Sequence, residues 1–322
     1  MPIQELEKAG FFPEDTRKIE TAFIPNPGED ALGNAILKRS QKTLDASTPS
    51  LLTEIKMLYA RELSNLRRDK VALMARFLFT TFLSLLIGVI FLDVGKADPA
   101  LNANINSQFG AIVIVMLMAM FGSAQPELIA FPEQRPIFLR EYSTDHYSVV
   151  SYFMARLTME CVLTALQTLL LVVICFYLIG FQSSFIIFYA ATYALAMAST
   201  ALGVLLGSGV EDPKLAQEFL PLLFVPQILF AGFYVTPALI PVWLRWARYL
   251  CTVTFALRIV LVAEFDRDCG SVQGNDNCQG LLEGIEATGE DTWWYWLVLA
   301  SLFGFFRLSA LLILQKKASK FY

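Results

Sequence analysis

The sequence contains two long stretches without a charged residue, and these limit the possible fold more than any other feature. One covers 28 residues at positions 99–126, and the other covers 50 residues at positions 161–210. A helix needs about 20 mostly apolar residues to cross a bilayer. Only 17% of the chain is charged, whereas soluble domains carry about 25%. The sequence therefore predicts an all-α membrane protein and excludes a nucleic-acid-binding domain, a secreted mini-protein and a disordered chain.

Apolar stretches of sufficient length predict six membrane-spanning helices. We expect these spans at about residues 72–92, 106–124, 152–179, 184–209, 216–236 and 293–315. Only the short stretch at positions 180–184 separates the third span from the fourth, so we expect these two helices to form a hairpin. The fifth span contains Pro221 and Pro226, each of which lacks a backbone donor, so we expect a kink there.

The distribution of basic residues predicts which ends of these spans face the cytoplasm. With six spans, 13 Lys and Arg residues fall on one side of the membrane and 5 on the other. Because cytoplasmic loops carry the excess of Lys and Arg, we expect both termini in the cytoplasm. All five Trp residues then cluster at the outer interface, where indole rings prefer to lie. The polar residues 1–47 are interpreted as a loose cytoplasmic linker that precedes a membrane domain over residues 48–322.

Residues 48–70 have the pattern of an amphipathic helix. Leu58 and Leu66 belong to a set of apolar residues that recur at helical spacing, and charged residues such as Arg61 and Arg68 fill the other face. Such a helix lies in the plane of the lipid headgroups, with its cations near the phosphates. An ordinary soluble helix packed against the rest of the chain is the alternative interpretation.

The cytoplasmic connection over residues 125–147 is predicted to form a short amphipathic helix of its own. Charged residues such as Glu127 and Glu133 alternate there with apolar residues such as Leu128 and Phe131. An apolar ridge that faces water usually marks a contact with a protein partner. A helix packed under its own bundle would have the same composition, so both interpretations stay open.

The outer segment over residues 237–291 does not fit a plain bundle of six helices. Its first half, at positions 239–265, is apolar enough to enter the membrane but carries Arg245, Arg248 and Arg258. A complete seventh span would place the C-terminus outside, against the basic residues near that end. We therefore expect a re-entrant helix or helix pair, whose backbone is tolerated at depth only where protein or a cavity surrounds it.

The second half of this outer segment is polar and contains Cys269 and Cys278. On the outer side of a cell membrane, thiols oxidise readily. We therefore predict a disulfide between these two residues, with a pair of free thiols as the alternative.

The sequence lacks the motifs of an enzyme or a metal site. Its Gly95-Lys96 pair has neither the upstream glycine nor the following Ser or Thr of a phosphate-binding loop. Common hydrolase motifs are absent and His146 is the only histidine, so we predict no catalytic residue and no metal site. Glu160 and Arg307 are ionisable residues inside predicted spans, which makes them candidates for function. We interpret them as a structural ion pair or, alternatively, as a gating element.

Three short motifs follow one another along the membrane domain. Residues 131–142 read Phe-Pro-Glu-Gln-Arg-Pro-Ile-Phe-Leu-Arg-Glu-Tyr, residues 230–235 read Phe-Ala-Gly-Phe-Tyr-Val, and residues 263–265 read Ala-Glu-Phe. Together with the order of the predicted elements, they resemble the membrane domain of ABC transporters of the G subfamily. This is the white, breast-cancer-resistance and pleiotropic-drug-resistance type, and the resemblance covers about residues 50–320.

The resemblance implies an exporter in which two such membrane domains enclose a central cavity. ATP and Mg²⁺ would bind to nucleotide-binding domains and not to these residues, and the coupling helix would transmit their closure. The implied coupling residues are Glu133, Arg135, Phe138, Arg140, Glu141 and Tyr142. The implied cavity residues are Leu117, Met120, Phe121, Phe224, Ile228, Phe233 and Tyr234. Core or dimer packing would explain the cavity residues equally well.

The resemblance therefore implies the permease part of an ATP-driven exporter of lipophilic or amphipathic small molecules or lipids, at the plasma membrane. Its partners would be a nucleotide-binding domain, a second membrane domain in a homodimer or heterodimer, membrane lipid and the hydrophobic substrate, but no nucleic acid. Family members usually carry the nucleotide-binding domain on the same chain. This sequence does not, so it is interpreted as a fragment, a separate subunit or a degenerate relative. A non-transporting scaffold that regulates an intact half-transporter is the alternative function.

The predicted disulfide can be tested directly. Replacing both Cys269 and Cys278 with Ser should weaken folding or trafficking, because a link across so short a loop stabilises the folded chain by roughly 2.5–3 kcal/mol. The measurements are the melting temperature of the double variant and the gel mobility of the unaltered chain with and without reductant. Unchanged mobility together with unchanged stability would contradict the disulfide.

Overall fold

The computed structural model describes residues 51–96, 102–142, 147–210, 212–233, 235, 240–271, 282, 284–287 and 292–319. The chain divides into two units, Met1–Thr53 and Glu54–Tyr322. The described helices belong to the second unit, except for residues 51–53, which begin the first of these helices. Throughout the described ranges the regular elements are helices, with no strand, which confirms the predicted all-α class.

The helices follow the chain in a simple order. They are α4 (Leu51–Arg68), α5 (Lys70–Ile90), α6 (Asn102–Tyr142), α7 (Val149–Ile179), α8 (Phe185–Gly209), α9 (Pro213–Phe230), α10 (Thr252–Ser271) and α12 (Thr292–Ala318), with short 3₁₀ helices η1 (Val94–Lys96) and η3 (Val242–Leu250). Within the described ranges, five helices are long and apolar enough to cross a membrane: α5, α6, α7, α8 and α12. The bent pair of η3 and α10 would make a sixth if it forms one span.

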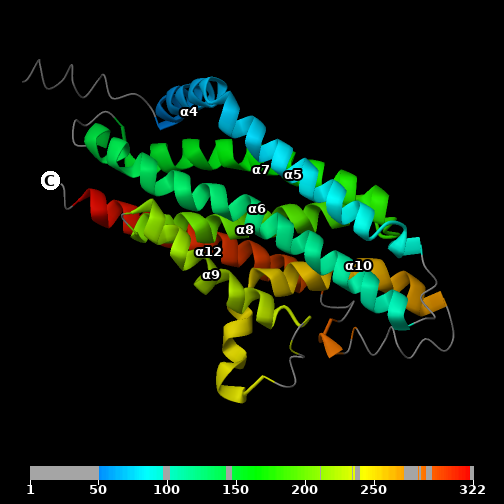
Figure 1. Cartoon of the computed structure of the whole chain (residues 1–322). Coiled ribbons are helices and arrows are strands. Elements are labelled where there is room, and N and C mark those ends of the chain that lie inside the picture. Colours follow the sequence, from blue (N-terminus) through cyan, green and yellow to red (C-terminus); the bar gives the residue numbers. More distant parts are fainter. Residues whose placement is uncertain are drawn as a thin grey trace, which may run out of the picture. The chain divides into compact units, whose positions relative to one another are not determined.

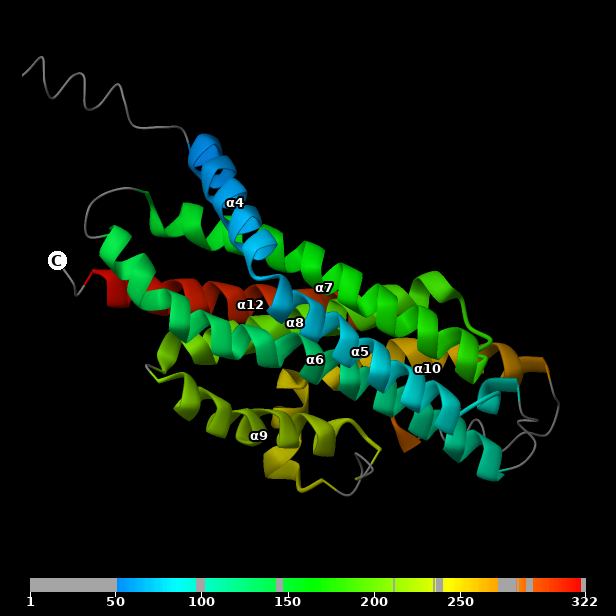
Figure 2. The ribbon, with the colours of Figure 1, turned by 45° about the horizontal axis from the view of Figure 1, so that its top comes forward.

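Helix α8 lies at the centre of the bundle. It packs against α6, α7, α10 and α12, while α5 packs against the outer side of α7. Both views of the ribbon show α6, α7, α8 and α12 running side by side (Figures 1 and 2). Many α8 residues are buried, among them Leu195, Ala198 and Val204. A helix that is apolar all round is expected to be buried in this way.

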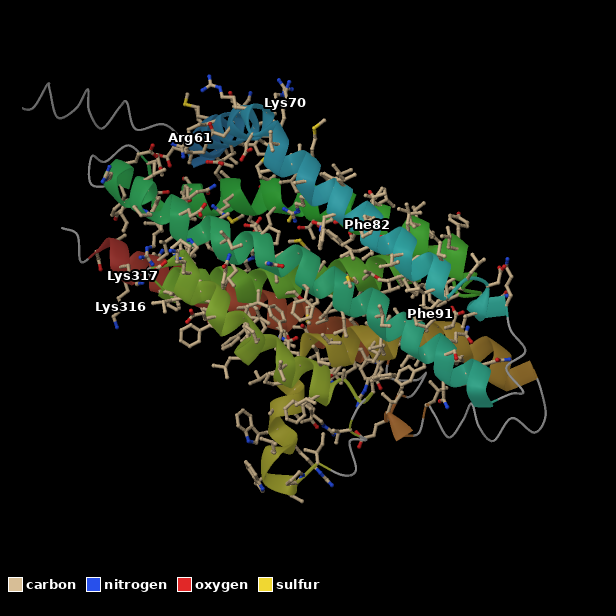
Figure 3. All side chains as sticks on the ribbon, viewed as in Figure 1. Arg61, Lys70, Phe82, Phe91, Lys316 and Lys317 are labelled. Atoms are coloured by element: carbon tan, nitrogen blue, oxygen red, sulfur yellow. The ribbon has the colours of Figure 1, made fainter. Side chains whose placement is uncertain are left out.

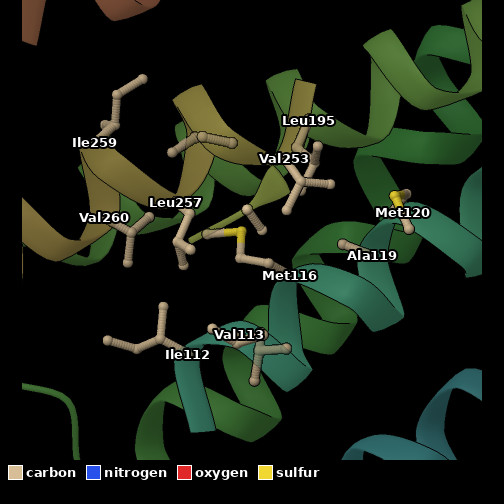
Figure 4. Packing of buried hydrophobic residues seen from close by; sticks show 14 of the residues in the cluster. Ile112, Val113, Met116, Ala119, Met120, Leu195, Val253, Leu257, Ile259 and Val260 are labelled. Carbon is tan, nitrogen blue, oxygen red and sulfur yellow. The ribbon is translucent and has the colours of Figure 1, made fainter. Parts of the chain in front are cut away.

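The main core joins α6, α8 and α10. It contains fully buried residues from each helix, including Met116, Leu195, Leu257 and Val260. Figure 4 shows part of this cluster, where α6 residues such as Met116 face α10 residues such as Leu257. Lipid tails are as apolar as these side chains, so the hydrophobic effect does not drive membrane helices together. Close packing of this kind supplies the attraction between them instead.

Two glycines bring α8 unusually close to α6. A Cβ atom at Gly203 would lie 2.9 Å from the carbonyl oxygen of Ala124, and one at Gly207 would lie 3.1 Å from Cβ of Phe131. Real Cβ atoms essentially never approach another heavy atom as closely as the first distance. Small residues at such crossings let two helix backbones approach, which is a common way to pack membrane helices.

Helix α6 differs from the prediction, because the second span and the predicted separate coupling helix form one continuous helix of 41 residues. Pro126 lies inside it and cannot donate to the carbonyl of Gly122 four residues earlier. Nε2 of Gln167 on α7 donates to that carbonyl at 3.1 Å. A neighbouring side chain thus replaces the backbone donor that is missing at Pro126, and the helix continues past position 124, where the second span was predicted to end.

The segment after α8 also differs from the prediction in detail. Asp212 caps α9 by accepting from the backbone N of Lys214, and Pro213 occupies the first turn. Helix α9 ends at Phe230, whereas the fifth span was predicted to reach position 236, and it is not among the five helices that pass as spans. A reason is its composition, since Lys, Glu, two Gln and three Pro occupy its 18 residues.

Part of the segment that was predicted to lie outside, residues 242–271, forms two helices. Helices η3 and α10 meet at a bend of 77°. Helix α10 is buried among α6, α8 and α12, with Val253, Ile259 and Val260 fully buried. This surrounding protein is the condition under which a broken or re-entrant helix is tolerated at depth.

The close approach of α8 and α6 predicts the effect of one added methyl group. Gly203→Ala should lower the free energy of unfolding by about 1–3 kcal/mol, because its Cβ meets a backbone oxygen that cannot move aside. In detergent, the melting temperature should fall by about 2–4 °C for each kcal/mol. Gly304→Ala on α12 is the matched control, since a Cβ there meets nothing within 4 Å. A melting temperature for Gly203→Ala equal to that of the control would refute the close approach.

Candidate functional site

One end of the bundle concentrates positive charge. Arg61, Lys70, Lys316 and Lys317 lie there, whereas Phe91 lies at the other end (Figure 3). The last turns of α6 reach the same end (Figure 1). We refer to it as the basic end. It contains the predicted coupling residues.

The predicted apolar ridge is largely wrong, because most of its residues are buried inside the bundle. Leu128, Phe131 and Phe138 are at most 2% exposed, and Leu139 is also buried. Ile137 is the exception, since 57% of it is exposed. The alternative, a helix packed under its own bundle, is therefore correct. Sequence alone could not exclude a water-facing ridge, because α7, α8 and α12 cover it from positions far along the chain.

Arg135 holds the end of α8 and does not face outward. Its Nη1 donates to the carbonyl oxygens of Ser208 at 3.3 Å and Val210 at 2.8 Å. The last carbonyls of a helix lack intrahelical donors and attract cations. Among the predicted coupling residues, Arg135 thus has a packing role within this chain.

An aromatic cluster joins the end of α6 to the start of α7. The ring of Phe138 stacks on Tyr152 with centroids 4.4 Å apart, and Tyr142 and Tyr147 lie beside it. Ser148 caps α7 by accepting from the backbone N of Ser151. Phe138 and Tyr142 therefore belong to internal packing.

Glu141 ties α4 to this cluster. Its Oε2 accepts a hydrogen bond from Nη1 of Arg61 at 2.7 Å and another from the Tyr147 hydroxyl. Burial raises the pKa of Tyr147, and its bond to Glu141 raises it further. Burial alone would lower the pKa of Arg61, but the bonds to Glu141 and Tyr147 outweigh it and the pKa is raised. Both donors thus keep their protons.

The coupling residues that remain exposed share one helix face. Glu133, Ile137 and Arg140 are exposed and lie one turn or two turns apart on α6. Two charged side chains therefore flank one apolar side chain at the basic end. This small face is the part of the predicted coupling stretch that a partner could reach.

Glu160 and Arg307 form an ion pair deep in the bundle. Glu160 on α7 accepts a hydrogen bond from Nη2 of Arg307 on α12, and Oγ1 of Thr200 on α8 lies 3.3 Å from the same nitrogen. The guanidinium also lies over the rings of Phe153 and Phe303. Both charged residues are at most 5% exposed. This geometry matches the interpretation as a structural ion pair.

A second, largely buried ion pair lies one turn away, and sequence reasoning missed it. Nη2 of Arg156 on α7 lies 2.9 Å from Oε2 of Glu127 on α6. Gln134 accepts from Nη1 of the same arginine, and the guanidinium lies over the ring of Phe131. The sequence did contain one signal for this pair. Glu127 and Gln134 are seven residues apart and therefore share a helix face, from which both can contact one arginine.

Glu264, in the Ala-Glu-Phe motif, binds the turn of the α7–α8 hairpin. It is 1% exposed and accepts from Nε2 of Gln108 at 2.9 Å. It also accepts from the backbone N of Gln182 at 2.8 Å and of Ser183 at 2.9 Å. Sequence reasoning noted the motif without a role for it. The structure shows that it fastens α10 to the hairpin.

The predicted cavity residues lie where α6 meets α9. Phe121 and Phe224 face each other with ring centroids 5.2 Å apart. Met120 is fully buried and Phe224 is 1% exposed, so these two belong to the core of the single chain. Leu117, Phe121 and Ile228 are partly buried, and Phe233 is 37% exposed.

Three predicted residues fall outside what the structure describes. They are Tyr234, Cys278 and the side chain of Cys269. Cys161, Cys175 and Cys251 are free thiols. Among the described residues there is no group of three or more His, Cys, Asp or Glu side chains that could hold a metal ion.

The Glu160–Arg307 pair predicts a strong coupling between two substitutions. Glu160→Gln alone and Arg307→Gln alone should each lower the free energy of unfolding by about 3–5 kcal/mol, because each leaves a buried charge unpaired. The double variant should lose clearly less than the sum of the two. Melting temperatures in detergent measure all three, with exposed Lys56→Gln as the control. Additive losses would show that the two charges do not interact.

Comparison with known proteins gives one family. Residues 53–265 match the family described as ABC-2 type transporter. ABC transporter G family member 1 of Dictyostelium discoideum is 23% identical over 291 residues, which cover 85% of this chain and 36% of the relative. Protein white of Drosophila melanogaster is 26% identical over 264 residues, which cover 79% of this chain and 38% of the relative.

A mammalian relative is covered to a similar extent. The broad substrate specificity ATP-binding cassette transporter ABCG2 of Bos taurus is 25% identical over 289 residues, which cover 83% of this chain and 42% of the relative. The chain thus matches well under half the length of each of these three relatives. Because the family match covers more than half of its 322 residues, the chain is a multi-pass membrane protein that belongs to the ABC-2 type transporter family, with homologues in the ABC transporter G family.

Proposed function

We propose that this chain is the membrane permease part of an ATP-driven exporter, which moves lipophilic or amphipathic small molecules or lipids out of the cytoplasm or the inner leaflet. The family membership supports transport across a membrane. The observation that carries the proposal is the exposed face of Glu133, Ile137 and Arg140, because it ends a helix whose other turns form the core.

The proposal places ATP and Mg²⁺ on a partner nucleotide-binding domain. The 322 residues contain no phosphate-binding loop, and the described residues offer no cluster of ligands for a metal ion. The residues present therefore do not fit a nucleotide site. This chain contributes the membrane path and the surface that the partner contacts.

Helix α6 is suited to carry a movement from that surface into the bundle. Its 41 residues extend over about 60 Å at 1.5 Å per residue. One part of it holds the exposed Ile137 and Arg140, and another holds Phe121 against Phe224 of α9. A tilt of this helix therefore moves the aromatic contact with α9.

The substrate path is proposed at the α6–α9 face, closed by a second membrane domain. The outward face of α9 is apolar, with Leu222 68% exposed and Val225 and Leu229 also exposed. Phe121, Ile228 and Phe233 lie beside it and retain partial exposure. Cavities lined by apolar and aromatic side chains suit hydrophobic ligands. We place the protein in the plasma membrane, with the basic end and both termini in the cytoplasm.

The exposed face at the basic end gives the deciding test. Ile137→Ser with Arg140→Glu should reduce export of a lipophilic dye by the assembled complex about tenfold, because a contact of about 1.4 kcal/mol is lost. Met57→Ser with Arg67→Glu is the matched control, since it makes the same exchanges at exposed positions of α4. Melting temperatures verify that both variants fold.

Dye export at the unaltered rate by Ile137→Ser with Arg140→Glu would contradict the coupling role of this face. If the chain serves only as a non-transporting scaffold, the unaltered chain combined with a nucleotide-binding partner, but without a second transporter, would export no dye. Reconstitution of the unaltered chain with its nucleotide-binding partner separates these outcomes.

A further inference from the structure

A cavity of about 520 Å³ opens where α4 turns into α5. It lies between this turn, the middle of α6 and the first half of α7, and it is separate from the α6–α9 face. Its size falls within the range of small-molecule sites, which is about 300–1,000 Å³. Apolar residues such as Leu66, Leu73 and Ile129 share its lining with charged ones.

We expect the position of this cavity along α5 to match the boundary between lipid headgroups and hydrocarbon. Helix α4 is amphipathic, and α5 begins at Lys70 directly after it. Such a helix lies in the headgroup plane. Arg76 lines the cavity and lies six residues further, about 9 Å along α5 at 1.5 Å per residue. The cavity therefore spans the depth at which a phospholipid carries its phosphate and glycerol.

Arg76 brings one guanidinium group to the lining of this cavity. Its Nε donates to Oε1 of Gln167 at 2.6 Å. Its Nη2 is buried and has no hydrogen-bond partner among the described residues. An arginine at this depth is costly unless each end of the guanidinium meets an acceptor. A phosphate oxygen is a matching acceptor for this group.

The remaining charges of the cavity are mostly negative. Five carboxylates and two guanidinium groups line it. Arg156 and Glu127 are paired with each other, and Glu160 is paired with Arg307. Glu62 at the rim lies 3.5 Å from Arg61, and Asp69 caps α5 through one oxygen. The lining thus disfavours a simple anion and favours a ligand with a cationic group beside its phosphate.

We propose that this cavity binds the headgroup of a phospholipid that carries a primary ammonium group. The phosphate accepts a hydrogen bond from the guanidinium group of Arg76, whose side chain lines the cavity. The ammonium group lies between the lining carboxylates of Glu62 and Asp69, and the acyl chains leave along α5, whose outer side is apolar and exposed at Met74 and Leu78. The site holds the α4–α5 turn against α6 and α7, and it does not depend on the proposed transport function.

Lipid binding by the purified full chain in detergent tests this proposal without any transport assay. Dioleoyl phosphatidylethanolamine, phosphatidylcholine and phosphatidylglycerol are added separately, and bound lipid is counted by native mass spectrometry. Phosphatidylethanolamine should bind about tenfold tighter than phosphatidylglycerol, since one charged contact is worth about 1.4 kcal/mol or more. Phosphatidylcholine should bind more weakly as well, because its quaternary ammonium cannot donate hydrogen bonds. Equal binding of all three lipids, or tighter binding of phosphatidylglycerol, would overturn the assignment.

Two variants and one competitor complete the test. Arg76→Gln should weaken phosphatidylethanolamine binding about tenfold, whereas Lys214→Gln, which removes a positive charge at an exposed position of α9 outside the cavity, should leave it unchanged. Glu62 lines the cavity, and Glu62→Gln should reduce the preference for phosphatidylethanolamine over phosphatidylglycerol. Unaltered binding by both Arg76→Gln and Glu62→Gln would refute the site. Competition by inorganic phosphate would show that the cavity takes a free anion and would refute the lipid.

Discussion

A proline inside a membrane helix leaves a carbonyl oxygen without its hydrogen-bond donor. In α6 the side chain that replaces this donor also connects two neighbouring helices. Hydrocarbon offers no water to replace the donor, so another part of the protein must supply it. Gln167 of α7 donates both to the carbonyl of Gly122, opposite Pro126, and to Oγ1 of Thr80 on α5. Its own oxygen accepts from Arg76 on α5. One amide side chain thus joins α5, α6 and α7 at the level of Pro126.

The buried ion pairs contribute to the register of α7 more than to net stability. A buried pair gains little over a well-packed apolar pair, because removing both charges from water is costly. Arg156 and Glu160 lie one turn apart on α7 and have opposite charges, with Glu127 facing the first and Arg307 facing the second. If α7 slipped by one turn, Arg156 would move to the level of Arg307 and like charges would meet. The alternation of sign along α7 therefore disfavours the nearest alternative packing.

Hydropathy was sufficient to predict α5, α7, α8 and α12, because each of these spans is a continuous apolar stretch. The Glu160–Arg307 pair could also be anticipated, since a charge in lipid needs a partner and few candidates exist. The continuity of α6 could not be predicted. Three prolines favour a break locally, and the donor that compensates for Pro126 comes from position 167. Burial of Phe131 and Phe138 likewise depends on residues far away in the sequence, which a local amphipathic pattern does not reveal.

The continuity of α6 also bears on how the proposed coupling would operate. Ile137 and Phe121 are 16 residues apart, which corresponds to about 24 Å along one helix. A coupling helix joined to its span by a loop could rotate without moving the span. In a single helix the weak points are Pro126, Pro132 and Pro136, where backbone hydrogen bonds are missing, and Gln167 bridges the one at Pro126. Bending at Pro126 would break the bond from Gln167 and strain its links to α5. In the proposed coupling, Gln167 would therefore favour a tilt of α6 against α9 over a bend at Pro126, and α5 would resist that tilt through the same glutamine.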